Sequence, residues 1–119
     1  MLNLLIVDDD KSKIQKIIDV VNELGVETHI ETAADVKTTE DKLFETQFDI
    51  LILDLYIPTE YGKKDEKPEN ARDLLNFIRV EDEIFKPYFI IGNTCREDTE
   101  EFKEYFSNHL YYLLKYDMM

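Results

Sequence analysis

The chain has 119 residues, of which 44% are hydrophobic, and this length allows one domain with its own core but not two. Its 27 acidic and 14 basic side chains give a formal net charge of -13, so most of the surface would repel a nucleic acid backbone. A single cysteine, Cys95, excludes an intramolecular disulfide framework. No segment resembles a signal peptide or a membrane span, so a cytoplasmic protein that binds neither membrane nor nucleic acid directly is expected.

Five short runs of the sequence predict β-strands. Four of them are almost continuously apolar, which is typical of strands buried on both faces of a parallel sheet. These four runs are 2–7, 49–57, 88–92 and 110–114. The fifth run, VETHIE at 26–31, is more polar and indicates an edge strand.

Helical patterns lie between these runs. Apolar residues recur at helical spacing in 11–24, at Ile14, Ile17, Ile18, Val21 and Leu24. Gly25 follows where a left-handed C-terminal cap is expected. Sparser patterns predict further helices at 35–46, 70–81 and 97–108. Strands that alternate with helices imply right-handed βαβ units, so the prediction is a single α/β domain over 1–119 with a doubly wound, five-stranded parallel sheet.

Polar side chains follow several of the predicted strands, at the edge where open parallel α/β sheets bind ligands. These residues are Asp8, Asp9 and Asp10 after the first strand, Asp54 in the third, Asn93 and Thr94 after the fourth, and Lys115 after the last. Converging carboxylates repel one another unless a cation neutralises them, and Mg²⁺ is a hard ion that prefers oxygen ligands. The pattern favours a magnesium site with Asp54 as a candidate nucleophile that forms an acyl phosphate, whereas Asp10 is predicted to cap the following helix.

Three segments, in order along nearly the whole chain, resemble the receiver domain of two-component response regulators: LLIVDDD, DILILDLYIP and YYLLK. The resemblance implies a flavodoxin-like, chemotaxis-regulator-like fold with strand order 2-1-3-4-5. It also implies a phosphorylatable signalling domain, not an enzyme that turns over an external substrate. A histidine kinase or phosphotransfer protein would be the phosphoryl donor, and a downstream protein effector would read the signal.

The resemblance also implies a role for each matching residue. Asp54 matches the phosphoacceptor. Asp8 and Asp9 match the acidic pair that binds Mg²⁺ together with Asp54, and the backbone carbonyl of Tyr56 matches the remaining protein ligand.

The last two predicted strands would carry the residues that respond to phosphorylation. Lys115 matches the lysine that contacts the phosphoryl group, and Tyr112 matches an aromatic residue whose rotamer follows phosphorylation. Thr94 matches the switch hydroxyl, although the spacing back from Lys115 would equally place Asn93 there.

Three features depart from the family's pattern. Tyr116 follows Lys115, where the family usually has a cis proline. The loop at 58–70 is roughly ten residues longer than expected and begins beside Asp54, where it could gate access. The family's fifth helix has no counterpart in 116–119, so an apolar face beside the first helix is expected to be covered by a second copy or a partner chain.

Two other functions fit parts of the same pattern. A receiver-fold module that dimerises or binds partners without being phosphorylated agrees with the missing helix and the absent proline. A small haloacid-dehalogenase-like phosphotransferase would use Asp8 as nucleophile and Asp10 as acid and base, because these residues also fit that family's strand-D-x-D signature. That family needs a second acidic pair late in the sheet, and 92–94 contains none.

Overall fold

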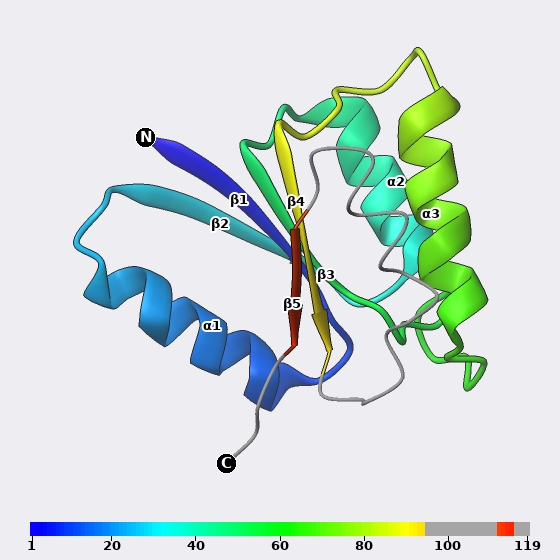
Figure 1. The fold of residues 1–119 in the computed structure, drawn as a ribbon, viewed down its shortest axis with the longest axis horizontal. Helices are drawn as coiled ribbons and strands as arrows, with labels where there is room; N and C mark the ends of the chain where they lie inside the picture. Colours follow the sequence, from blue (N-terminus) through cyan, green and yellow to red (C-terminus); the bar gives the residue numbers. More distant parts are fainter. Residues whose placement is uncertain (95–111, 116–119) are drawn as a thin grey trace.

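The computed structural model describes residues 1–94 and 112–115, and for Thr94 and 112–115 it describes the backbone (Figure 1). Its elements, in chain order, are β1 (Leu2–Val7), α1 (Lys11–Glu23), β2 (Thr28–Ala33), α2 (Val36–Glu45), β3 (Ile50–Asp54), α3 (Pro68–Val80), β4 (Phe89–Thr94) and β5 (Tyr112–Lys115). The predicted helix at 97–108, Cys95 and the segment 116–119 lie outside the described residues. No helix in the described ranges is long and apolar enough to cross a membrane.

The five strands form one parallel sheet in the order β2-β1-β3-β4-β5, which confirms the predicted fold class and strand order. β2 lies at one edge of the sheet, as its polar sequence predicts. The strand order reverses at β1, whose neighbours are β2 and β3, so the carboxyl ends of β1 and β3 flank the position where such folds bind ligands.

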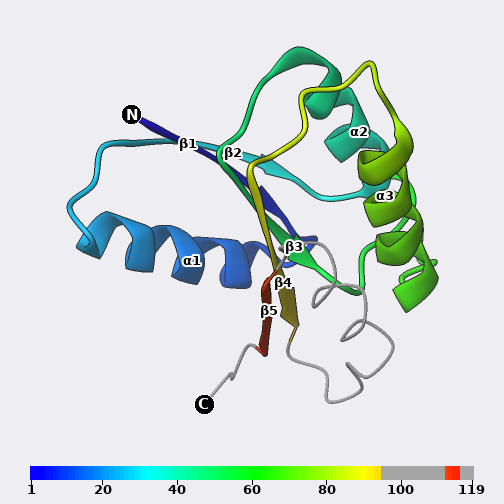
Figure 2. The same ribbon diagram turned by 45° about the horizontal axis from the view of Figure 1, so that its top comes forward.

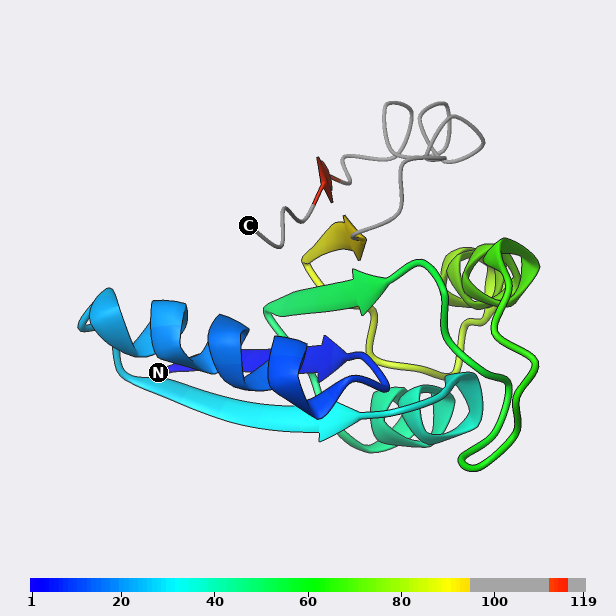
Figure 3. The same cartoon turned by 90° about the horizontal axis from the view of Figure 1, so that it is seen from below.

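The helices are divided unequally between the two faces of the sheet. α1 lies on one face, and α2 and α3 lie together on the other (Figures 1 and 2). Viewed from below, α1 runs along β1 and β2, on the side of the sheet away from α2 and α3 (Figure 3).

Some element boundaries differ from the sequence prediction. β4 extends through Asn93 and Thr94, because Asn93 pairs with Asp54 of β3 and Thr94 pairs with Lys115 of β5. β2 is shifted toward its C-terminus and ends at Ala33. α3 begins at Pro68, inside the predicted loop, since the fixed φ of proline suits the first turn of a helix. Gly25 has φ 71°, in agreement with the predicted left-handed cap.

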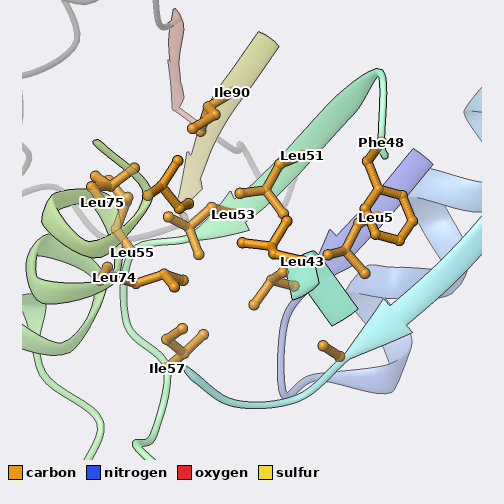
Figure 4. Close-up of a cluster of buried hydrophobic side chains, with 14 of the residues drawn as sticks. Leu5, Leu43, Phe48, Leu51, Leu53, Leu55, Ile57, Leu74, Leu75 and Ile90 are labelled. Atoms are coloured by element: carbon orange, nitrogen blue, oxygen red, sulfur yellow. The ribbon is translucent and has the colours of Figure 1, made fainter. Parts of the chain in front are cut away.

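The main hydrophobic core fills the space between the sheet, α2 and α3. Leu51 and Leu53 of β3 point toward Leu74 and Leu75 of α3, and all four side chains are fully buried (Figure 4). Each side chain of this size contributes about 1.5–3 kcal/mol of stabilisation on burial. This face therefore supplies most of the energy that fixes the sheet.

The opposite face, under α1, is packed less completely. The apolar side chains at Ile14, Ile17, Ile18 and Val21 are only partly buried, and Val20 is 58% exposed. A groove of about 430 Å³ runs between α1 and the sheet, lined by Lys16, Ile17, Val20, Val21, Ile52, Ile91 and Asn93. The groove lies on the face that the sequence analysis expects a second copy or a partner to cover, and that expectation stays a prediction.

Candidate functional site

Three carboxylates gather at the carboxyl end of the sheet. Asp8 and Asp9 directly follow β1, and Asp54 is the last residue of β3. One oxygen from each of the three lies within 4.8 Å of the other two. Asp8 and Asp54 are buried, with 2% and 7% of their surface exposed, whereas Asp9 is exposed at the rim. The sequence therefore identified correctly which acidic residues would come together.

A buried lysine that the sequence analysis did not identify lies among these carboxylates. Lys13 Nζ is 3.0 Å from Asp8 Oδ2 and 3.5 Å from Asp54 Oδ1, and its side chain is 4% exposed. A signal was present in the sequence, since Lys13 precedes Ile17 by four residues and thus shares the inward stripe of α1.

The turn between β1 and α1 explains why Asp8 and Lys13 meet. Asp8 Oδ1 accepts a hydrogen bond from the Asp10 N–H at 2.9 Å, which holds its carboxylate inside the turn. Asp10 Oδ1 accepts from the N–H groups of Ser12, at 2.9 Å, and Lys13, at 3.4 Å, so Asp10 is the N-cap of α1, as predicted. α1 therefore begins at once and places Lys13 over Asp8 in its first turn.

The position of Asp10 bears on the haloacid-dehalogenase-like alternative. Its exposed carboxylate is engaged in capping α1 and is not part of the acidic group that Asp8 forms with Asp54. An acid and base catalyst would need to face the nucleophile. The geometry therefore does not favour a D-x-D phosphotransferase.

Burial and mutual repulsion make the three carboxyls hold protons more tightly. Burial raises the pKa of Asp54 to about 7, with a further contribution from the charge of Asp8, while Lys13 acts in the opposite direction. Burial also raises the pKa of Asp8, and partial loss of hydration together with the charges of Asp8 and Glu66 raises that of Asp9. A cation at this position would relieve the repulsion.

The backbone register places β4 beside Asp54, and β5 lies on the far side of β4. Asp54 pairs with Asn93, and Thr94 pairs with Lys115. Asn93 is 4% exposed, and its Oδ1 has no hydrogen-bond partner among the described residues. The side chains of Thr94, Tyr112 and Lys115 lie outside the described part of the structure, so their switch roles stay predictions.

The segment that follows Asp54 is more ordered than a solvated loop. The Tyr56 N–H donates to Asp54 Oδ1 at 3.3 Å. Asp65 accepts hydrogen bonds from the N–H and the hydroxyl of Thr59, at 3.0 and 2.6 Å. Asn70 Nδ2 donates to the carbonyls of Ile57 and Asp65, at 2.9 and 2.7 Å, and is buried. The loop thus closes on itself and is tied to α3.

The same loop borders the acidic site. Its backbone docks on the start of α2, where the N–H groups of Val36 and Lys37 donate to the carbonyls of Pro58 and Thr59, each at 3.1 Å. A depression of about 290 Å³ beside it is lined by Asp9, Ala34, Pro58, Tyr61, Gly62, Lys63, Lys64 and Glu66. The predicted position of the loop next to the site is therefore correct, and a gating role stays a prediction.

Comparison with known proteins agrees with this fold. No protein-family model matches the chain. The uncharacterised protein y4jS of Sinorhizobium fredii is 31% identical over 94 residues, which cover 78% of this chain and 22% of that protein. The chain thus spans about a fifth of the length of this curated relative.

Among solved structures, the chemotaxis response regulator CheY4 of Vibrio cholerae has a TM-score of 0.66 and 25% identity, over 91% of this chain and 79% of that one. The Mn²⁺-bound response regulator Rcp1 has a TM-score of 0.75 and 16% identity, over 95% of this chain and 80% of that one. The non-phosphorylated HemR receiver domain of Leptospira biflexa has a TM-score of 0.67 and 18% identity, over 95% of this chain and 81% of that one. The chain has the receiver-domain fold of response regulators, which confirms the resemblance found in the sequence.

The acidic group fits the metal site of a receiver domain. Its donors are all carboxylate oxygens, the ligands that hard divalent cations prefer. Two of the donors are buried beside each other, an arrangement that a bound cation stabilises.

Proposed function

We propose that the chain is a phosphorylatable signalling switch of the two-component type, with Asp54 as the phosphoacceptor. The observation that carries this proposal is the placement of Asp54 at the carboxyl end of a central strand, within 4.8 Å of carboxylate oxygens of Asp8 and Asp9. In a receiver fold this is the topological switch point, where a ligand approaches from solvent.

The reaction is a transfer from a phosphohistidine of a histidine kinase or phosphotransfer protein. An Asp54 oxygen attacks phosphorus, a P–O bond forms, the P–N bond breaks, and the released imidazole nitrogen takes the electron pair. Burial raises the pKa of Asp54 to about 7 in the metal-free site, and a bound Mg²⁺ would favour the ionised, nucleophilic carboxylate. Mg²⁺ held by Asp8, Asp9, Asp54 and the Tyr56 carbonyl would neutralise charge that develops on the phosphoryl oxygens.

The proposed output is protein contact. The ammonium of Lys115 and the hydroxyl of Thr94 would be drawn toward the phosphoryl group, and Tyr112 would change rotamer in response. Support comes from the backbone register, which pairs Thr94 with Lys115 in the two strands beyond Asp54. A downstream effector in the cytoplasm would recognise the altered surface.

A second candidate is an interaction module that is never phosphorylated. The observation in its favour is the apolar groove beside α1, which has the character of an interface and lies on the opposite face from the main core. In this case the acidic site would have no role in signalling, and the groove would be the surface that binds a partner.

Phosphorylation by acetyl phosphate distinguishes the two candidates. With Mg²⁺ present, the intact chain should gain the mass of one phosphoryl group, and Asp54→Ala should abolish the gain. Asp73→Ala, at an exposed aspartate of α3, is the matched control and should still be modified. No mass gain, or a gain that survives Asp54→Ala, would overturn the phosphoacceptor proposal.

A further inference from the structure

Lys13 is the one fully buried residue of α1, a helix whose residues are all described. The isoleucines and valines of the same helix are partly exposed, so the helix buries a charge in preference to its apolar side chains. Removing an ammonium from water is costly unless it is paired, and Lys13 lies within ion-pair distance of two carboxylates, Asp8 and Asp54. The carboxylates therefore explain the burial of Lys13.

Both carboxylate oxygens of Asp8 already contact groups of the chain. Its Oδ1 accepts from the Asp10 N–H at 2.9 Å, and its Oδ2 lies 3.0 Å from Lys13 Nζ. Asp54 Oδ1 likewise accepts from the Tyr56 N–H and lies 3.5 Å from Lys13 Nζ. Both oxygens of Asp8 and the Oδ1 oxygen of Asp54 thus already contact groups of the chain itself.

A divalent ion coordinated by Asp8 and Asp54 would share oxygens with Lys13. Mg²⁺ binds oxygen ligands at about 2.0–2.1 Å, so an ion bound to these atoms would lie against the ammonium group. Two cations this close in a buried site repel each other strongly, because little water screens them. Lys13 and a metal ion therefore exclude each other from the pair formed by Asp8 and Asp54.

We propose that Lys13 is a built-in counterion that occupies the cation position of this site and has to be displaced before a divalent ion binds. The inference rests on the metal site of the proposed function and adds a regulatory step to it. Lys13 neutralises charge in the metal-free site and weakens its affinity for Mg²⁺. Asp54 therefore becomes competent for phosphoryl transfer when Mg²⁺ displaces Lys13.

Mg²⁺ affinity of Lys13→Met, measured by calorimetry without any phosphoryl donor, tests the inference. The variant keeps the length of the side chain and removes its charge, so it should bind Mg²⁺ at least about tenfold more tightly than the unmodified chain. Lys16→Met, at an exposed lysine of the same helix, carries the same change of net charge and should have little effect. Unchanged or weaker binding in Lys13→Met, or no binding in either protein, would overturn the inference.

A second measurement uses the unmodified chain and does not depend on the folding of a variant. A buried, paired ammonium exchanges its protons slowly, so Lys13 should give an NMR signal from its Nζ hydrogens that the exposed lysines lack. Adding Mg²⁺ should remove or shift that signal. A signal that persists unchanged at saturating Mg²⁺ would show that the ion and Lys13 coexist and would contradict the inference.

These tests separate the inference from the proposed function. Tighter Mg²⁺ binding by Lys13→Met, combined with no phosphoryl transfer to Asp54, would leave Lys13 as a counterion and overturn the phosphoacceptor proposal. Phosphoryl transfer to Asp54, combined with an Mg²⁺ affinity that does not depend on Lys13, would support the phosphoacceptor proposal and overturn the inference about Lys13.

Discussion

The two faces of the sheet differ in what they bury. The face toward α2 and α3 buries leucine, isoleucine and phenylalanine completely, whereas the face toward α1 has a groove in its middle and a cluster of charged groups at its carboxyl end. Adjacent residues of one strand fall on opposite sides of this division: Ile90 is fully buried in the main core, and Ile91 lines the groove. The first face fixes the fold, and the second is free to carry chemistry and contacts.

Truncation of Ile90 and Ile91 should show this difference most strongly. Ile90→Ala should lower the free energy of unfolding by about 2–5 kcal/mol, because it leaves a cavity in a closely packed core. Ile91→Ala removes the same atoms from the wall of an existing groove and should cost less than half as much. Urea unfolding of both variants gives the comparison, and equal losses would contradict it.

Replacement of Asp54 should show how the burial of a carboxyl group at the face toward α1 makes the free energy of unfolding depend on pH. The pKa of Asp54 is raised from 3.8 to about 7, so the folded chain binds more protons than the unfolded chain between these values. The stability that this provides is fully present below about pH 4 and is lost as pH rises through about 7, with a slope of at most about 1.4 kcal/mol per pH unit.

Asp54→Asn cannot ionise and should remove most of that slope. In the absence of metal, the variant should therefore be more stable than the unmodified chain above about pH 7. A smaller slope should remain, since the pKa of Asp8 is also raised by burial. Urea unfolding across this pH range measures the effect, and the same slope in both proteins would show that Asp54 does not hold its proton in the folded state.

Loss of the N-cap of α1 or of α2 should have a smaller effect on stability, and the effect should differ between the two helices. Asp10 is exposed, whereas Asp35 is 1% exposed and accepts from the Thr38 N–H at 2.5 Å. Asp35→Ala should cost about 2 kcal/mol and Asp10→Ala about 1 kcal/mol, because an uncapped helix end is more costly where water cannot reach it. Thermal unfolding ranks the two variants, and a larger loss for Asp10→Ala would reverse the expected order.

The smallest effect on stability is expected at Val20. This residue is 58% exposed on α1, so Val20→Ser should change the free energy of unfolding by no more than about 0.5 kcal/mol. If a second copy covers the groove, the same substitution should weaken self-association in sedimentation experiments. A chain that is monomeric over a wide concentration range, before and after the substitution, would argue against self-association through this face.

The sequence predicted the fold because its strongest signals are local and agree with one another. The apolar runs at 2–7 and 49–57 leave little choice of strands, and the alternation with helices limits the topology to a parallel sheet. The ends of strands were harder to predict. Asn93 and Thr94 are polar and do not continue an apolar run, yet Asn93 pairs with Asp54 of β3 and Thr94 pairs with Lys115 of β5.

The acidic residues of the site were predictable, and Lys13 was not. Asp8, Asp9 and Asp54 stand at strand ends, where a parallel sheet brings them together. Lys13 is a single lysine among several in α1, and its burial depends on a contact with Asp54, a residue far away in the chain. Helical periodicity alone places Lys13 on the inward face of α1, but it does not indicate whether the ammonium group is buried or extends to solvent.

The loop after β3 has a consequence for how the chain resists proteases. Lys63 and Lys64 are exposed and stand where trypsin would be expected to cut first. Cleavage requires several residues to leave their folded positions, and the hydrogen bonds at Thr59, Asp65 and Asn70 hold both sides of this stretch. The insertion that departs most from the lengths usual in such folds is therefore expected to survive limited digestion longer than its exposure suggests.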